Sequence, residues 1–191
     1  MMDYYEIKDR AELLSRYCGD YPRLKGVVSN LDQVVIDFVP DLKDAWSIRE
    51  HVAHLADVEI RAFVRYRSSI IDNGIELLLG GGNVDQNNRL LRYGSQELGD
   101  SLEIIRLLRK ITVAHVSLMT DAEMEGYCVR LPEAGMINLK MILSIYTQHM
   151  EKHLEYLLRN IALFNEKTKS VLQSRGLKGA AHRGRHSAEQ V

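Results

Sequence analysis

Apolar residues recur at steps of three and four positions through most of this chain, and that spacing limits the folds open to it. Such steps place apolar side chains in one stripe along an α-helix, whereas the side chains of a strand alternate every second residue. Only three prolines occur in 191 residues, and alternating β-branched runs are scarce. The sequence therefore predicts a mainly helical, all-α protein. In one segment the stripe consists of Leu98, Leu102, Ile105, Leu108, Thr112, Val116 and Met119.

Four long helices are predicted, and three connections join them. They cover roughly residues 9–31, 47–73, 96–119 and 138–167. The first is expected to bend or restart near Pro22, because proline removes a helix hydrogen bond and clashes with the preceding turn. Four helices of this length favour a four-helix bundle, in which cofactor sites are built from side chains on facing helices.

Capping patterns mark where two of the helical segments begin. Ser47 followed three residues later by Glu50 is a capping box, so the second long helix is expected to begin there. Thr120 and Glu123 form the same pattern and are expected to open one short helical turn. Residues 127–137 contain proline and glycine, and we expect them to form a long, extended connection between the third and fourth helices.

The chain is predicted to form one bundle domain, residues 1–168, followed by a disordered tail, residues 169–191. A length of 191 residues is sufficient for one domain to bury a core. From Ser174 onward the residues become small, polar and basic, and this composition is typical of a disordered segment.

Composition and charge argue against several classes of function. The formal net charge of −1 argues against nucleic acid or an anionic membrane as the main partner, and DNA association through the basic tail is the weakest hypothesis. No apolar run approaches the roughly 18 residues that cross a bilayer, and the N-terminus lacks the features of a signal peptide. Cys18 and Cys128 are expected to be free, buried thiols because their spacing fits no metal motif. The sequence predicts a cytoplasmic protein.

Two histidines, His149 and His153, lie one helical turn apart in the last predicted helix. They point to the same side as Ile142, Ile145 and Leu157, which places them on the stripe that faces the core. Buried imidazoles need hydrogen-bond or metal partners, because an unsatisfied ring nitrogen is costly. A shared divalent ion satisfies both rings; the alternative is that each ring bonds a carbonyl or a tyrosine hydroxyl. The spacing leaves both interpretations open.

Three further histidines are candidates for a third ligand. On the second predicted helix, His51 points slightly closer to the apolar stripe than His54, which lies at its edge. Helical periodicity does not separate these two. His115 is the single histidine of the third predicted helix, and such a residue is more often packed or exposed than a ligand.

The segment from Trp46 to Glu59 resembles a signature of the DinB-like family, in particular its YfiT-like branch. That signature reads Trp-Ser/Thr-x-x-Glu/Gln-x-x-x-His-Leu-Ala-Asp, and its histidine corresponds to His54. A second signature, Tyr-x-x-His-x-x-x-His, matches Tyr146, His149 and His153.

Between the two signatures, the segment Pro132-Glu-Ala-Gly135 resembles the Pro-Glu-x-Gly connection of the same branch. The order and approximate spacing of the three motifs agree over residues 9–165. There are also departures, because Leu131 and Lys152 stand where relatives often carry histidine. These departures weaken an assignment as a thiol transferase but leave the three histidine ligands intact.

The resemblance implies a three-histidine site for a divalent ion, commonly Zn²⁺ or Ni²⁺, held by His54, His149 and His153. It also implies a homodimer. Family members with known chemistry include transferases that join low-molecular-weight thiols to electrophiles, and a thiol-dependent isomerase. An ion held by three imidazoles retains an open position that can activate a water or a thiol.

The favoured hypothesis is therefore a metal-dependent thiol S-transferase or hydrolase that acts on a small molecule. Asp57 is a candidate catalytic residue that orients an imidazole, with an ion pair to Arg61 as the alternative. Tyr146 is a candidate hydrogen-bond donor to substrate, with packing as the alternative. A non-catalytic dimeric bundle, serving as a binding or stress-response module with a structural metal or none, is the competing hypothesis.

Overall fold

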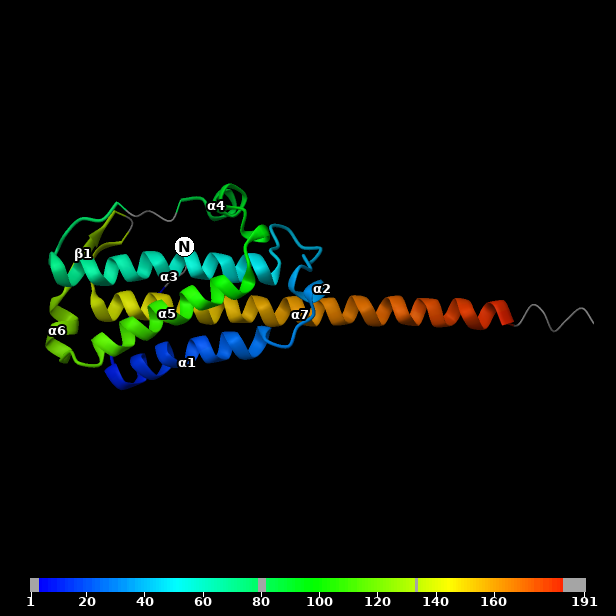
Figure 1. Cartoon of the computed structure of the whole chain (residues 1–191), viewed down its shortest axis with the longest axis horizontal. Coiled ribbons are helices and arrows are strands. Elements are labelled where there is room, and N and C mark those ends of the chain that lie inside the picture. The colour runs from blue at the N-terminus through cyan, green and yellow to red at the C-terminus, as the bar shows by residue number, and fades with distance from the viewer. Residues whose placement is uncertain (1–3, 79–81, 133, 184–191) are drawn as a thin grey trace, which may run out of the picture.

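In a computed structural model of the chain, four long helices form a bundle (Figure 1), which confirms the predicted fold class. The structure describes residues 4–78, 82–132 and 134–183, with residues 174–183 described by their backbone only. The long helices are α1 (Arg10–Val28), α3 (Ile48–Ile71), α5 (Leu98–Val116) and α7 (Leu139–Arg183).

Short elements fill the connections between the long helices. They are α2 (Gln33–Ile36), α4 (Val84–Leu91), the 3₁₀ turn η1 (Tyr93–Ser95), α6 (Asp121–Gly126), β1 (Cys128–Leu131) and β2 (Gly135–Asn138). The two strands pair antiparallel, so the predicted extended connection is a β-hairpin. Its extended backbone agrees with the prediction, but the pairing was not predicted, because four-residue strands carry too short a pattern to be recognised.

Both predicted capping boxes are present. The Ser47 side chain accepts a hydrogen bond from the Glu50 backbone N–H, and the Glu50 carboxylate accepts from the Ser47 backbone N–H. Thr120 and Glu123 repeat this arrangement at the start of α6. These caps satisfy backbone donors that would otherwise be unpaired at the start of each helix.

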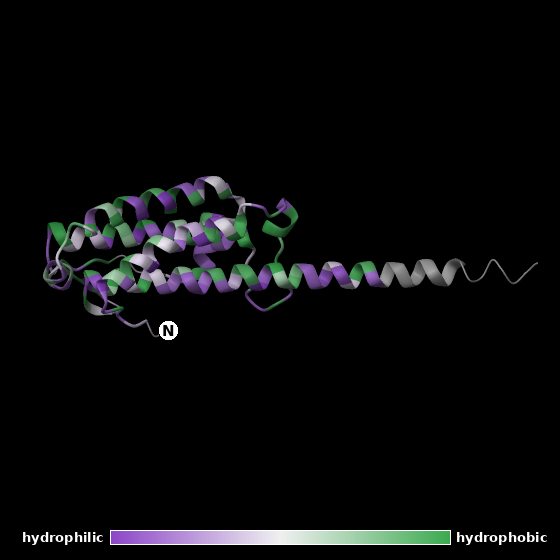
Figure 2. Ribbon diagram, turned by 90° about the horizontal axis from the view of Figure 1, so that it is seen from below, coloured by the Kyte–Doolittle hydropathy of each residue, from purple (hydrophilic) through white to green (hydrophobic). Residues whose placement is uncertain are grey.

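The four long helices surround a common core. Helix α1 packs against α5 and α7, and α3 packs against the same two helices, so α1 and α3 lie across the bundle from each other (Figure 1). Hydrophobic and hydrophilic residues are interspersed along the coloured parts of the long helices (Figure 2), as helices with one buried side require. Among the described residues, no helix combines the length and apolar character that crossing a bilayer requires. Both cysteines are free thiols, but Cys18 is exposed and Cys128 is half-buried, so the expected burial of both is wrong.

Two expectations about where helices break or end are wrong: α1 does not restart at Pro22, and α7 does not end near Lys167. Helix α1 continues through Pro22, because Tyr17 and Leu24 on either side of it are buried and their packing outweighs one lost hydrogen bond. Helix α7 extends to Arg183; no glycine or proline lies between Lys167 and Gly176, and the helix then continues through Gly176 and Gly179. Residues 184–191 lie outside the described residues, so the division into a bundle and a disordered tail stays a prediction.

A buried ion network joins the four long helices. Arg109 on α5 is 3% exposed; its Nη1 donates to Asp20 Oδ2 on α1 at 2.8 Å, and its Nη2 donates to Glu59 Oε1 on α3 at 2.6 Å. The same guanidinium donates to the Tyr146 carbonyl on α7 at 3.2 Å and lies over the Tyr17 ring. Burial raises the pKa of Asp20 to about 6 despite the adjacent Arg109. The network fixes how α3 and α7 are placed relative to α5.

Candidate metal centre

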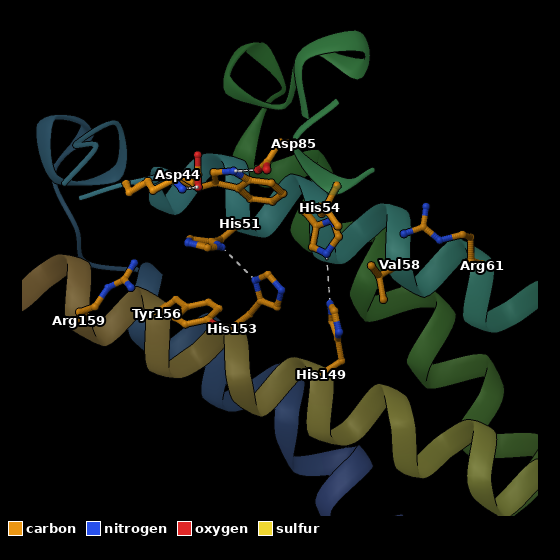
Figure 3. A pocket seen from close by; sticks show the side chains of 13 residues that line it. Asp44, His51, His54, Val58, Arg61, Asp85, His149, His153, Tyr156 and Arg159 are labelled. Carbon is orange, nitrogen blue, oxygen red and sulfur yellow. Dashed lines mark hydrogen bonds and ion pairs between the residues drawn. The ribbon is translucent and has the colours of Figure 1, made fainter. Parts of the chain in front are cut away.

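Three histidines converge between α3 and α7. His54 comes from α3, and His149 and His153 come from consecutive turns of α7 (Figure 3). One ring nitrogen of each lies within 4.8 Å of the others, and the Nε2 atoms of His54 and His149 are 3.2 Å apart. The structure thus brings together the three residues that the sequence analysis predicted as ligands.

The donor set fits a divalent ion. Two imidazole nitrogens on a tetrahedral zinc ion, each at the usual 2.0–2.1 Å, stand about 3.3 Å apart, close to the His54–His149 separation of 3.2 Å. Burial lowers the pKa of His54 to about 3 and that of His149 to about 4, so both rings are neutral near pH 7, as metal ligands must be. Burial and the neighbouring imidazoles lower the pKa of His153 as well.

Hydrogen bonds orient two of the three rings. The Tyr4 hydroxyl lies 2.8 Å from His149 Nδ1, and His51 Nδ1 lies 3.0 Å from His153 Nδ1. His54 Nδ1 is buried and has no hydrogen-bond partner among the described residues. Metal-binding histidines generally bond a second group through the nitrogen that does not face the metal. Tyr4 and His51 lie at hydrogen-bond distance from Nδ1 of His149 and His153 respectively.

A cavity of about 480 Å³ adjoins the three histidines. Its size is within the range of small-molecule sites. Aromatic rings form part of its wall: the Trp46 ring lies 5.3 Å from the His54 ring and donates through Nε1 to Asp85 at 3.2 Å. The remaining lining residues are Lys43, Asp44, His51, Val58, Arg61, Val84, His149, His153, Tyr156 and Arg159.

The other predicted site residues lie beside the cluster. Asp57 Oδ2 accepts from Arg61 at 2.8 Å and from the Tyr93 hydroxyl at 3.0 Å, which is the ion-pair alternative of the sequence analysis. The Tyr146 side chain is buried, and its hydroxyl accepts from Arg65 at 3.0 Å. Catalytic roles for Asp57 and Tyr146 stay predictions.

His115 is placed apart from the three ligands. Its Nδ1 shares a hydrogen bond with the Tyr66 hydroxyl, and the two rings meet edge to face. Tyr4 and Tyr156 also belong to the site, although no sequence motif indicated either residue. Tyr4 precedes the first helix in a segment with no periodic pattern, so no sequence signal places it 2.8 Å from His149.

The depressed histidine pKa values predict that acid destabilises the metal-free protein. His51, His54 and His149 have folded-state pKa values of about 4, 3 and 4 against 6.5 in model compounds. A group with a depressed folded pKa contributes stability above its unfolded pKa and loses it as pH falls towards the folded value. From about pH 7.5 to about pH 5, each of these rings should lower the free energy of unfolding by about 2 kcal/mol.

Asp20 opposes this trend, since its pKa is raised to about 6 and its protonation in the fold adds roughly 1 kcal/mol over the same interval. Three histidines outweigh one carboxyl group, so a net loss is expected in urea unfolding. His149→Gln should reduce the loss, whereas His115→Gln, outside the cluster, should preserve it. Stability that is constant or rising towards pH 5 would contradict the buried neutral state of the rings.

The fold and the site together define a four-helix-bundle protein whose facing helices carry a three-histidine centre suited to a divalent ion. The family model of the DinB superfamily matches residues 20–157, and the chain belongs to that superfamily. The resemblance inferred from the sequence motifs is therefore confirmed.

A solved structure shares this fold. It is YfiT from Bacillus subtilis, described as a probable metal-dependent hydrolase with an unusual four-helix bundle topology. It superposes with a TM-score of 0.73 and 17% identity, covering 86% of this chain and 93% of YfiT. At this identity the likeness establishes the fold. No match was found among curated proteins.

Proposed function

We propose that this protein is a divalent-metal-dependent enzyme that acts on a small molecule, with hydrolysis as its reaction. The observation that carries the proposal is the convergence of three neutral imidazoles, His54, His149 and His153, beside a cavity of about 480 Å³. A purely structural metal site is closed by its protein ligands, whereas a catalytic site keeps a position for water or substrate. Three histidines next to a cavity match the catalytic pattern.

A divalent ion held by three imidazoles lowers the pKa of a bound water or thiol, so that a nucleophile forms near neutral pH. The chain supplies the rest of the site. Tyr4 holds the His149 ring through Nδ1, and the Trp46 and Tyr156 rings give the cavity aromatic walls. Arg159 lines the cavity and offers a positive charge for a polar or anionic group of the substrate.

The relative YfiT supports hydrolysis as the reaction, because it is described as a probable metal-dependent hydrolase. An ion held by the same three histidines would also bind a thiol. The alternative reaction is therefore the attack of a low-molecular-weight thiol on an electrophile. The predicted homodimer and cytoplasmic location stay predictions.

The test compares metal-free protein with protein reloaded with Zn²⁺ or Ni²⁺. Each form is assayed against a panel of esters and amides, and against thiols paired with an electrophile. We expect turnover only in the reloaded protein, with hydrolysis of at least one ester or amide. Turnover of the thiol panel alone would show that the protein is a thiol transferase and not a hydrolase. Metal binding without turnover in either panel would favour the non-catalytic bundle.

A further inference from the structure

His51 is a buried histidine of the cluster that does not belong to the ligand group. It lies one turn before His54 on α3 and is 5% exposed. The ligand group formed within 4.8 Å comprises His54, His149 and His153. His51 instead faces His153 across the interface between α3 and α7, with Nδ1 atoms 3.0 Å apart (Figure 3). The contact with His153 therefore indicates the role of His51.

We propose that His51 is a positioning residue for the ligand His153, accepting a hydrogen bond from its Nδ1–H and thereby leaving its Nε2 for the metal. The inference rests on the proposed metal site and assigns to it a residue beyond the three ligands. A neutral imidazole carries one proton, so a ring that binds metal through Nε2 carries that proton on Nδ1. The atom placed to accept it is His51 Nδ1.

The surroundings of His51 hold its ring in this position. Its ring stacks on Tyr156 at 5.4 Å between centroids and 28° between planes, and it contacts the Trp46 ring at 5.5 Å. A ring fixed on two sides keeps Nδ1 directed at His153. Because His51 accepts through Nδ1, its own proton lies on Nε2. This Nε2 atom is buried and has no hydrogen-bond partner among the described residues. The His51 side chain also lines the cavity.

Tyr4 fulfils the equivalent role for His149, with its hydroxyl 2.8 Å from Nδ1. Two ligands on consecutive turns of α7 are thus contacted by two different parts of the chain, His149 by the segment before α1 and His153 by α3. Partners of this kind usually accept through a carboxylate, a carbonyl or water. Here the acceptor for His153 is a second imidazole.

The decisive experiment compares His51→Leu with His51→Asn in the full-length protein. The two replacements have similar shapes, but the Asn Oδ1 atom stands near the former Nδ1 and retains a hydrogen-bond acceptor. Zinc affinity is measured by competition with a chelator, and the melting temperature of each metal-free variant is measured separately. We expect His51→Leu to weaken zinc binding by roughly 10–100-fold and His51→Asn to restore most of that loss.

The control is His115→Leu, which removes an imidazole bonded to Tyr66 and should leave zinc affinity unchanged. Equal weakening by His51→Leu and His51→Asn would overturn the proposal, because it would show a packing effect. Unchanged affinity in both would overturn it as well. Failure of the parent protein to bind zinc would instead refute the metal site itself, and the positioning role with it.

Discussion

Replacing His149 with alanine is expected to abolish stoichiometric binding of a divalent ion. The parent protein, untagged and reloaded with Zn²⁺ or Ni²⁺, should carry about one equivalent, as a single three-histidine site allows. Removing one of three ligands should cost more than the 10–100-fold typical of residues outside the ligand set. Elemental analysis after dialysis gives the metal content directly.

The same result is expected for His54→Ala and His153→Ala, because all three ring nitrogens lie within 4.8 Å of one another. His115→Ala is the matched control: it deletes an imidazole from α5 and should retain the full equivalent. Circular dichroism on each variant establishes that the bundle is still folded. A His149→Ala protein that keeps its metal would show that the ligand set is wrong.

Much of the fold could be predicted because it depends on local signals. Helix α3 begins directly after its N-cap Ser47, because the capping box with Glu50 satisfies its first backbone donors. The extension of α7 past Lys167 could have been predicted as far as Gly176, because no glycine or proline lies between these residues. The small, polar and basic residues from Ser174 onward instead favoured an earlier end of the helix. The hairpin around Gly135, with its φ of 70°, depends on pairing between two short strands, which local patterns do not encode.

The candidate metal centre was only partly predictable. Helical periodicity predicts which side of a helix faces the core, but it does not predict which residues of two helices touch each other. His51 and His54 are both buried on α3 and both meet α7, one at His153 and the other at His149. Periodicity alone could not decide between them, and the motif pointed to His54. Tyr4 required knowledge of the tertiary structure, because its partner His149 lies 145 positions along the chain.

Replacing Arg109 with methionine is expected to lower the free energy of unfolding by about 3–5 kcal/mol, because it removes the cation that both buried carboxylates bind and leaves Asp20 only a longer ion pair, 3.8 Å, with Arg23. Asp20 and Glu59 are 0% and 2% exposed and both accept hydrogen bonds from Arg109. Methionine occupies a volume similar to that of arginine, so the loss of stability measures mainly the lost charge and hydrogen bonds. Urea unfolding at neutral pH measures it. Arg106→Met, which breaks an ion pair with Glu103 at the exposed surface of the same helix, is the control and should change little.

Removing the buried carboxylate charges as well tests whether their loss of a cation causes the destabilisation. Adding Asp20→Asn and Glu59→Gln to Arg109→Met should recover part of the lost stability, because an uncharged buried site no longer carries unpaired charge. An Arg109→Met protein as stable as the parent would show that the network contributes little. Since Arg109 binds both Glu59 on α3 and the Tyr146 carbonyl on α7, its loss loosens the two helices that carry the histidines. If this loosening reaches the candidate metal centre, added Zn²⁺ should raise the stability of the variant by less than it raises that of the parent, because the variant would bind the ion more weakly.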